Sequence, residues 1–229
     1  MLTNVNVQPL TITVDDTQSV SGLLQTTAKA RACYVMAHGA GAGMTHPFMA
    51  AVADGFAERG IATLRYQFPY MERGSKRPDA PKVAQAAVRA AVGEAARRLP
   101  GLSLFAGGKS FGGRMTSQTQ AAAPLAGVRG LVFFGFPLHP AGHPSEERAA
   151  HFAAVQVPLL FLQGTRDELA DLTLLQGLGG KLGTRMRLEL FEHADHSFHV
   201  PARTGRTEAD VRVDMLDRCA AWIATTLGH

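Results

Sequence analysis

The feature that most constrains this chain is an alternation of short apolar runs with longer amphipathic segments. The runs have the length of buried parallel strands: Cys33 to Ala37, Ala62 to Tyr66, Leu102 to Ala106, Gly130 to Phe134, Pro158 to Leu162 and Met186 to Phe191. The segments between and after them favour helices: Pro47 to Arg59, Pro81 to Leu99, Gly112 to Ala122, Glu146 to Val155, Asp171 to Leu182 and Glu208 to Leu227. Because parallel strands need crossover connections, this alternation predicts an α/β fold with a mostly parallel central sheet and helices on both faces.

The beginning of the chain has a different pattern. Val7 to Val14 and Ser19 to Leu24 have the composition of short strands around a polar turn, which predicts an antiparallel pair. The 229 residues suffice for one α/β domain with a buried core, and no repeat or linker divides them, so we expect a single domain over 1–229. The stretch from Phe134 to Pro158 is too short for a separate cap domain, which predicts an open site.

Composition argues against several classes of protein. Hydrophobic residues make up 46% and charged residues 18% of the chain, and no apolar run approaches the ~20 residues that cross a bilayer. Met1 to Leu10 lacks a basic start followed by an apolar stretch, so we expect no signal peptide and a cytoplasmic protein. The net charge of +4 comes from scattered arginines. The cluster from Arg73 to Arg77 is too short, and too poor in aromatic residues, to indicate a nucleic-acid surface.

The spacing of the cysteines bears on whether the chain binds a metal or a redox cofactor. Cys33 and Cys219 have no spacing that suggests zinc or redox work, so we expect two reduced, at least half-buried thiols. The sequence indicates no cofactor and no metal site, and no feature of it indicates an oligomeric state.

The strongest chemical signal follows the strand predicted from Leu102. The residues from 107 to 113 are Gly-Gly-Lys-Ser-Phe-Gly-Gly, and a predicted helix begins there. Gly108-x-Ser110-x-Gly112 between a strand and a helix is the pattern of a nucleophile elbow. The sharp turn holds a serine hydroxyl out toward a base at the cost of a strained backbone, and the glycines give the turn room. The pattern makes Ser110 the candidate nucleophile, although a glycine-rich packing turn fits the motif alone.

An acid and a base follow at later strand ends. Asp167 comes just after the strand that ends at Leu162, and His196 lies just after the last strand. In such sheets ligands bind beyond the carboxyl ends of the strands, so these side chains are expected near Ser110. His196 is the candidate base that accepts the serine proton, and Asp167 is the candidate acid that orients the imidazole.

Each of these assignments has a competitor in the sequence. Asp167 also fits a helix N-cap, and Asp171 is the alternative acid. His193 and His199 are alternative bases. We prefer His196 because the loop that carries it returns toward the serine.

The loop after the first parallel strand is a candidate for part of an oxyanion hole. Residues 38–44 are small apart from His38 and Met44, so the backbone can approach a ligand closely. We predict the amide of Ala40 as one donor, with Gly39 and Gly41 as alternatives, and the amide of Phe111 at the helix start as the other. We expect His38 to brace the loop by hydrogen bonds.

Taken together, these segments resemble a known family. The resemblance rests on His38-Gly39-Ala40-Gly41, Arg65-Tyr66-x-Phe68-Pro69-Tyr70, residues 108–114, Gly135-Phe136-Pro137-Leu138-His139-Pro140, residues 163–167 and Asp195-His196-Ser197-Phe198. The chain is similar to the compact, capless α/β-hydrolases that are related to dienelactone hydrolases and include testis-expressed protein thirty. The resemblance implies an α/β-hydrolase fold without a cap and a Ser-His-Asp triad, and it leaves the substrate open. From the triad we expect a serine hydrolase that acts on a small-molecule acyl substrate. Dienelactone hydrolases use cysteine in place of Ser110, so their substrate is not transferred to this chain.

The remaining pocket predictions concern residues at or just after strand ends. Apolar side chains there either line an acyl or alcohol pocket or belong to the core: Phe68, Tyr70, Phe111, Phe136, Pro137 and Leu138. The substrate-binding candidates among them are Phe68, Tyr70, Phe136 and Leu138. Lys109 and Arg114 flank the serine. They favour either an anionic substrate or a plain pair of exposed or salt-bridged cations at a helix start.

Two other functions compete with hydrolysis. Gly108-Lys109-Ser110 resembles the end of a phosphate-binding loop, but that pattern needs a glycine at position 103, where this chain has Ser103. A non-catalytic binding or scaffold role is the stronger alternative, because fold does not fix function.

Overall fold

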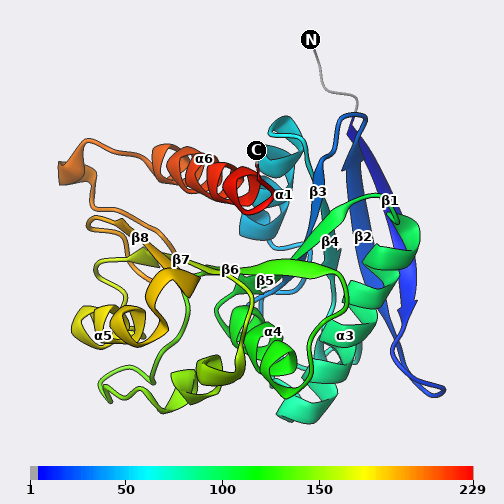
Figure 1. The fold of residues 1–229 in the computed structure, drawn as a ribbon, viewed down its shortest axis with the longest axis horizontal. Helices are drawn as coiled ribbons and strands as arrows, with labels where there is room; N and C mark the ends of the chain where they lie inside the picture. Colours follow the sequence, from blue (N-terminus) through cyan, green and yellow to red (C-terminus); the bar gives the residue numbers. More distant parts are fainter. Residues whose placement is uncertain (1–4, 229) are drawn as a thin grey trace.

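A single mixed sheet organises the molecule. The computed structural model describes residues 5–228. The eight strands lie in the order β1-β2-β4-β3-β5-β6-β7-β8 (Figure 1). Their bounds are Val5–Thr13, Ser19–Thr27, Ala32–Ala37, Ile61–Tyr66, Ser103–Lys109, Val128–Phe134, Leu159–Gly164 and Met186–Phe191 for β1 to β8. β1 pairs antiparallel with β2 and β2 with β4, whereas β3 to β8 form parallel pairs.

Helices cover both faces of the sheet, as the sequence predicts. α1 (Pro47–Glu58) and α6 (Glu208–Thr226) pack on one face, and α3 (Pro81–Arg98), α4 (Phe111–Ala122) and α5 (Leu172–Leu182) pack on the other. Every residue of β3 and of β4 is buried, because both strands lie in the middle of this sandwich. The two apolar layers are the main stabilising feature of the fold.

Some of the connections differ from the sequence prediction. The segment Glu147–Ala154 is a 3₁₀ helix where an α-helix is predicted. Its buried side chains Ala149 and Phe152, followed by Val155, are spaced by three residues, which matches the 3₁₀ period. A short helix, α2 (Pro69–Glu72), lies in a stretch that the sequence analysis leaves unassigned. Between β6 and β7 the 3₁₀ helix is the only described helix, in accordance with the predicted lack of a cap domain.

The cysteines lie on opposite faces of the sheet. Cys33 packs in the layer that holds α3 and α4, and Cys219 packs in the layer that holds α1 and α6. Both are free and buried, as predicted. Burial raises the pKa of the Cys33 thiol to about 12, although a backbone hydrogen bond from Leu64 acts in the opposite direction.

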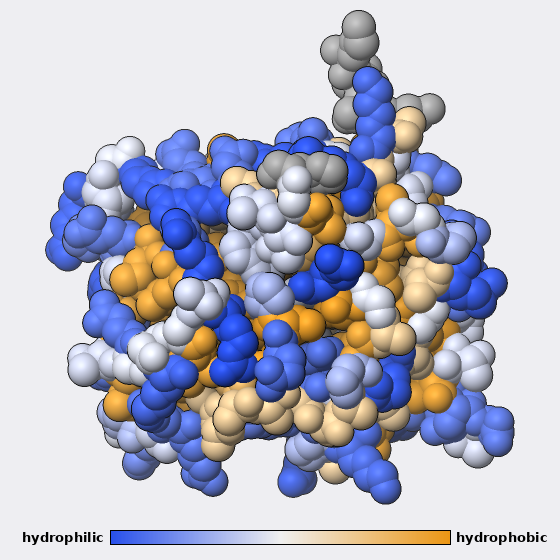
Figure 2. Space-filling view, viewed as in Figure 1, coloured by the Kyte–Doolittle hydropathy of each residue, from blue (hydrophilic) through white to orange (hydrophobic). Residues whose placement is uncertain are grey.

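The exterior is predominantly polar on the face that Figure 2 shows, and apolar side chains form patches between polar ones. None of the helices within residues 5–228 combines the length and the apolarity that crossing a membrane requires.

Candidate active site

Ser110 occupies a strained turn between β5 and α4. Its φ of 50° and ψ of −115° place a non-glycine residue in a disfavoured region, which costs about 1–3 kcal/mol. The Ser110 amide donates to the Phe134 carbonyl oxygen at 3.2 Å, and the Arg114 amide donates to the Ser110 carbonyl oxygen at 3.1 Å. β5 ends directly before Ser110 and α4 begins directly after it, so the Ser110 side chain projects beyond the carboxyl edge of the sheet.

The glycines of the elbow permit a very close approach to the neighbouring strand. A Cβ atom on Gly108 would lie 2.1 Å from the Ala37 carbonyl oxygen, and one on Gly112 would lie 2.5 Å from the same atom. No side chain fits at either position. The two glycines therefore let α4 begin directly against the end of β3, which brings Ser110 beside the loop that follows β3.

Ser110, His196 and Asp167 form a continuous hydrogen-bonded chain. His196 Nε2 lies 2.8 Å from Ser110 Oγ, and His196 Nδ1 lies 2.7 Å from Asp167 Oδ2. The Asp167 side chain is fully buried, while that of His196 is 24% exposed. The structure thus brings together the three side chains that the sequence selects from three different strand ends.

Neighbouring polar groups hold the Asp167 carboxylate in place. Its Oδ1 accepts a hydrogen bond from the Leu169 amide, and its Oδ2 accepts one from Gln163 Nε2. Gln163 Oε1 accepts from the Phe136 amide at 2.9 Å, which ties β7 to the loop after β6. Gln163 is not among the residues predicted from the sequence, although its place at the end of a buried strand, four residues before the acid, is a signal that marks it.

The competing assignments have other roles. Asp171, the alternative acid, is the N-cap of α5 and accepts from the Leu174 amide at 3.0 Å. His193 is exposed beside Glu192. His199 is exposed and pairs with Asp195 and Glu208.

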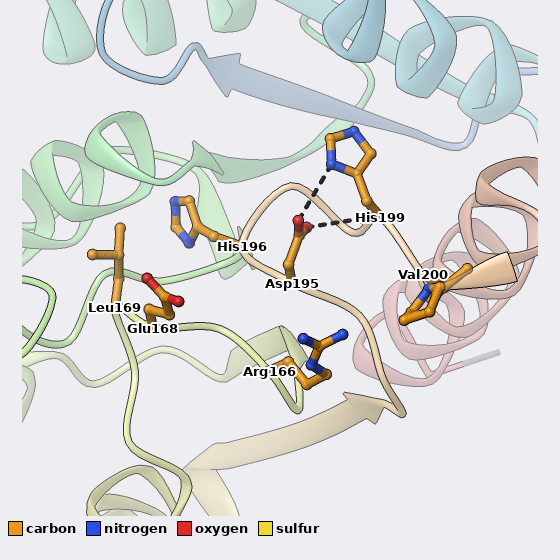
Figure 3. Close-up of a pocket in the computed structure, with 8 residues that line it drawn as sticks. Arg166, Glu168, Leu169, Asp195, His196, His199 and Val200 are labelled. Atoms are coloured by element: carbon orange, nitrogen blue, oxygen red, sulfur yellow. Dashed lines mark hydrogen bonds and ion pairs between the residues drawn. The ribbon is translucent and has the colours of Figure 1, made fainter. Parts of the chain in front are cut away.

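The loop that carries His196 is held from two directions. Asp195 Oδ1 accepts hydrogen bonds from the backbone amides of Ser197 and His199, at 2.8 and 2.9 Å. Figure 3 shows the Asp195 carboxylate turned toward His199, with His196 on the other side of the loop. From the elbow side, the Lys109 ammonium donates to the His196 carbonyl oxygen. These contacts fix the loop on both sides of the imidazole.

Two backbone amides with no acceptor among the described residues lie near Ser110. The Gly41 amide donates to the Tyr70 hydroxyl at 3.1 Å, so it is not free to bind a ligand. No acceptor within residues 5–228 pairs with the amides of Ala40 or Phe111. Ala40 is exposed while Gly39 is buried, so of the three loop candidates Ala40 best matches a donor that faces a ligand.

His38 braces this loop, as the sequence predicts. Its Nδ1 donates to the Gly39 carbonyl oxygen at 2.7 Å, and its Nε2 accepts from the Phe68 amide at 3.0 Å. Burial lowers the pKa of His38 to about 4, although the hydrogen bond to Gly39 acts in the opposite direction. The ring is therefore neutral and uncharged at physiological pH, which suits a structural donor and acceptor.

The predicted substrate-binding side chains require a correction. Phe68, Tyr70, Phe136 and Leu138 are all fully buried in the core layer that contains α3 and α4. They follow the strand ends but turn inward, because aromatic neighbours pack around them: the Phe68 ring lies 5.3 Å from that of Phe111. These four side chains belong to the core that packs behind the site, and they do not line it.

A cavity of about 660 Å³ lies beside Ser110. One wall comes from the loop after β3 and from the first turns of α1, with Ala40, Pro47 and Phe48 among its residues. The opposite rim carries His199 and the α6 residues Glu208 and Arg212. A second hollow of about 550 Å³ adjoins it at His196 and is lined by Arg166, Glu168 and Pro201, among others (Figure 3).

Lys109 and Arg114, the two cations that flank Ser110, are neither well exposed nor in salt bridges. This corrects the expectation of a plain pair of exposed or salt-bridged cations at a helix start. Lys109 is the last residue of β5 and is half-buried. Burial lowers the pKa of its ammonium group to about 8, although Asp167 and Asp195 act in the opposite direction. Arg114 is half-buried, and burial followed by the charge of Arg148 lowers its pKa.

A second serine–histidine contact lies deeper in the protein. His151 Nε2 is 2.8 Å from Ser117 Oγ, and that hydroxyl donates to the Arg114 carbonyl oxygen at 3.0 Å. Ser117 is fully buried within α4. Burial, followed by the charge of Arg114, lowers the pKa of His151 to about 4. No cluster of acidic, histidine or cysteine side chains suited to a metal ion occurs within residues 5–228.

The chain matches a known sequence family, and its fold is similar to those of several solved structures. Residues 30–224 match the sequence family described as an α/β hydrolase domain. A dienelactone hydrolase from Anabaena variabilis superposes with a TM-score of 0.76 at 18% identity, over 96% of this chain and 98% of that one. A serine hydrolase without a lid from Xanthomonas campestris gives 0.72 at 19% identity, over 95% of each chain. A Thermus thermophilus protein gives 0.74 at 24% identity, over 99% of each chain.

Proposed function

Because this chain belongs to the α/β-hydrolase domain family, we propose that it is a serine hydrolase that cleaves a carboxylic ester, thioester or related acyl bond. Its fold is the predicted α/β-hydrolase fold, and its structural neighbours include hydrolases. The observation that carries the proposal is the hydrogen-bonded chain from Ser110 through His196 to Asp167, beside two amides with no acceptor among the described residues. We place this chemistry in a single domain over 1–229.

In the first half of the proposed reaction, Ser110 Oγ attacks the acyl carbonyl carbon. His196 Nε2 takes the hydroxyl proton, and Asp167 holds the ring orientation and stabilises the imidazolium. The carbonyl oxygen becomes negatively charged and accepts hydrogen bonds from the Ala40 and Phe111 amides, which have no acceptor among the described residues. The bond to the leaving group then breaks, the leaving group takes the proton from His196, and the acyl group remains on Ser110.

In the second half, water replaces the leaving group. His196 removes a proton from the water as its oxygen attacks the acyl carbon, and the same two amides bind the new oxyanion. Collapse of this intermediate returns the proton to Ser110 Oγ and releases the acid. The 2.8 Å contact between His196 and Ser110 supports this role, because proton transfer needs hydrogen-bond distance.

Within the family, we propose that the chain groups with the capless hydrolases that include testis-expressed protein thirty. The support is the set of loop motifs around the three strand ends, from residues 38–41 to residues 195–198. A site without a cap suits small-molecule acyl substrates that enter directly from solvent.

Covalent labelling tests the proposal. A fluorophosphonate probe is expected to modify Ser110 alone, as mapped by peptide mass spectrometry, and Ser110→Ala is expected to abolish labelling. A series of esters of increasing acyl length then defines the preferred chain. Folded protein that the probe does not label, and that hydrolyses no ester in the series, would instead indicate a non-catalytic binding protein on a hydrolase fold.

A further inference from the structure

The cavity beside Ser110 has an uneven distribution of charge. Lys109 and Arg212 line it, and the single carboxylate among its described lining residues is Glu208. Glu208 is turned toward His199, with its Oε1 3.6 Å from the imidazole Nε2. Lys109 is engaged with the His196 carbonyl oxygen. The remaining cation, Arg212, faces the cavity from α6.

Arg212 differs from Arg206 and Arg218, which precede and follow it in the sequence. Arg206 lies 3.3 Å from a carboxylate oxygen of Asp214, and Arg218 pairs with both Asp214 and Glu189 at 2.7 and 2.8 Å. Among the ion pairs of residues 5–228, none includes Arg212, although its side chain is half-buried. A half-buried arginine that lacks a carboxylate partner is well suited to bind an anion from solution.

The cavity surface also contains apolar groups from α1. Pro47, Phe48 and Met49 line the cavity together with Ser110 and Arg212. We infer that Arg212 determines specificity for acyl substrates that carry a carboxylate, with the aliphatic part of the substrate against this α1 wall. The inference rests on the proposed function, since it concerns substrates that Ser110 cleaves.

The carboxylate has two chemical sources, and matched substrates distinguish them. Monomethyl adipate carries the charge on the acyl part, and methyl hexanoate is its neutral counterpart with the same number of acyl carbons. The butyryl ester of glycolate carries the charge on the leaving group, and ethyl butyrate is its neutral counterpart. For each pair, the ratio of kcat/KM for the charged ester to that for the neutral ester measures the preference for the anion.

Three substitutions test the role of the guanidinium group. In Arg212→Gln the preference for the anion is expected to fall at least about tenfold in one of the two pairs, because a hydrogen bond to a charged group is removed. Activity on the neutral esters is expected to stay near that of the wild type. Arg212→Lys is expected to restore part of the preference. Arg203→Gln is the control for net charge, because Arg203 is exposed and outside the cavity.

Each outcome is decisive. Three results overturn the inference. In Arg212→Gln, kcat/KM falls equally for the charged and the neutral ester of a pair, or the preference for the anion falls in neither pair. In the control, Arg203→Gln lowers that preference as much as Arg212→Gln does. Hydrolysis that persists in Ser110→Ala overturns the proposed function instead. If none of the four esters is hydrolysed, protection of Ser110 from the fluorophosphonate by adipate and by hexanoate gives the same comparison. Equal protection by the two acids in wild-type protein then overturns the inference.

Discussion

Two serine–histidine contacts of equal length occur within residues 5–228, and only one has the surroundings of a nucleophile. Ser110 and Ser117 each lie 2.8 Å from an imidazole Nε2. Ser110 stands at a strained strand-to-helix turn and borders a cavity. Ser117 lies inside α4 and is completely buried.

The partners of the two histidines explain the difference further. The carboxylate of Asp167 accepts a hydrogen bond from His196, whereas His151 has the cation Arg114 close by. The Ser117 hydroxyl also lies 3.0 Å from the Arg114 carbonyl oxygen, so His151 is not its only hydrogen-bond partner. Distance between serine and histidine is therefore a weak criterion for a catalytic pair. A carboxylate, free amides and access to a ligand separate the two cases.

The largest expected contrast is between the two serines. Ser110→Ala is expected to lower kcat/KM for a short-chain ester by about 10⁴ or more, as for other triad nucleophiles. Ser117→Ala should leave kcat/KM near that of the wild type and cost about 1–3 kcal/mol of unfolding free energy, because it removes a buried hydroxyl and leaves the His151 imidazole without this hydrogen-bond partner. Steady-state kinetics and urea unfolding measure both effects. A large loss of activity in a folded Ser117→Ala protein would remove the distinction drawn between the two pairs.

The next contrast concerns the two aspartates that compete for the acid role. Asp167→Asn is expected to lower kcat by about 10³ to 10⁴, because the amide no longer stabilises the imidazolium or fixes the tautomer of His196. Asp171→Ala removes the N-cap of α5 and is expected to cost about 1 kcal/mol of stability with little change in kcat. Comparable kinetic defects in the two variants would contradict the assignment of Asp167.

A smaller effect is expected from the contact behind His196. Lys109→Met removes the ammonium group that binds the His196 carbonyl oxygen. We expect kcat for a neutral ester to fall about tenfold with KM little changed, because a small displacement of the imidazole slows proton transfer more than binding. A change confined to KM would show that Lys109 contacts the substrate and does not position the loop.

The smallest expected effect is on the pH dependence of the unfolding free energy, and it comes from His151. The pKa of folded His151 is lowered to about 4 from an ordinary value of 6.5, so the unfolded chain binds this proton first as pH falls. Stability contributed by the neutral ring is present above pH 6.5 and is lost as pH falls toward 4. His151→Gln is expected to flatten the dependence of unfolding free energy on pH in this window by on the order of 1 kcal/mol. An unchanged slope in urea unfolding between pH 7 and 4 would contradict this.

The fold was accessible from the sequence because its elements are marked locally. Short apolar runs in alternation with amphipathic segments predicted β3 to β8, strand-like composition around a polar turn predicted β1 and β2, and most boundaries shift by only a few residues in the structure. The strand ends then selected Ser110, Asp167 and His196, since parallel strands place their carboxyl ends on one edge. The segment Glu147–Ala154 was predicted as a helix but its 3₁₀ type was not, because a spacing of three is close to the α-helical spacing over so few residues.

The lining of the site was not accessible in the same way. Phe68 and Leu138 follow strand ends, yet whether such a side chain turns into the core or toward solvent depends on its neighbours in space. Gln163, Lys109 and Arg212 act through contacts with groups that are distant along the chain. Their roles leave no periodic pattern in the sequence.

The sequence alone thus determined the order of strands and helices and the residue types at each strand end, because hydrophobic periodicity and tight-turn glycines are local properties. Tertiary structure decided which serine–histidine pair has a carboxylate, which loop amide stays free, and which arginine faces the cavity. Those outcomes depend on distances between segments that only packing brings together, and hydrogen bonds and charges act over such short distances.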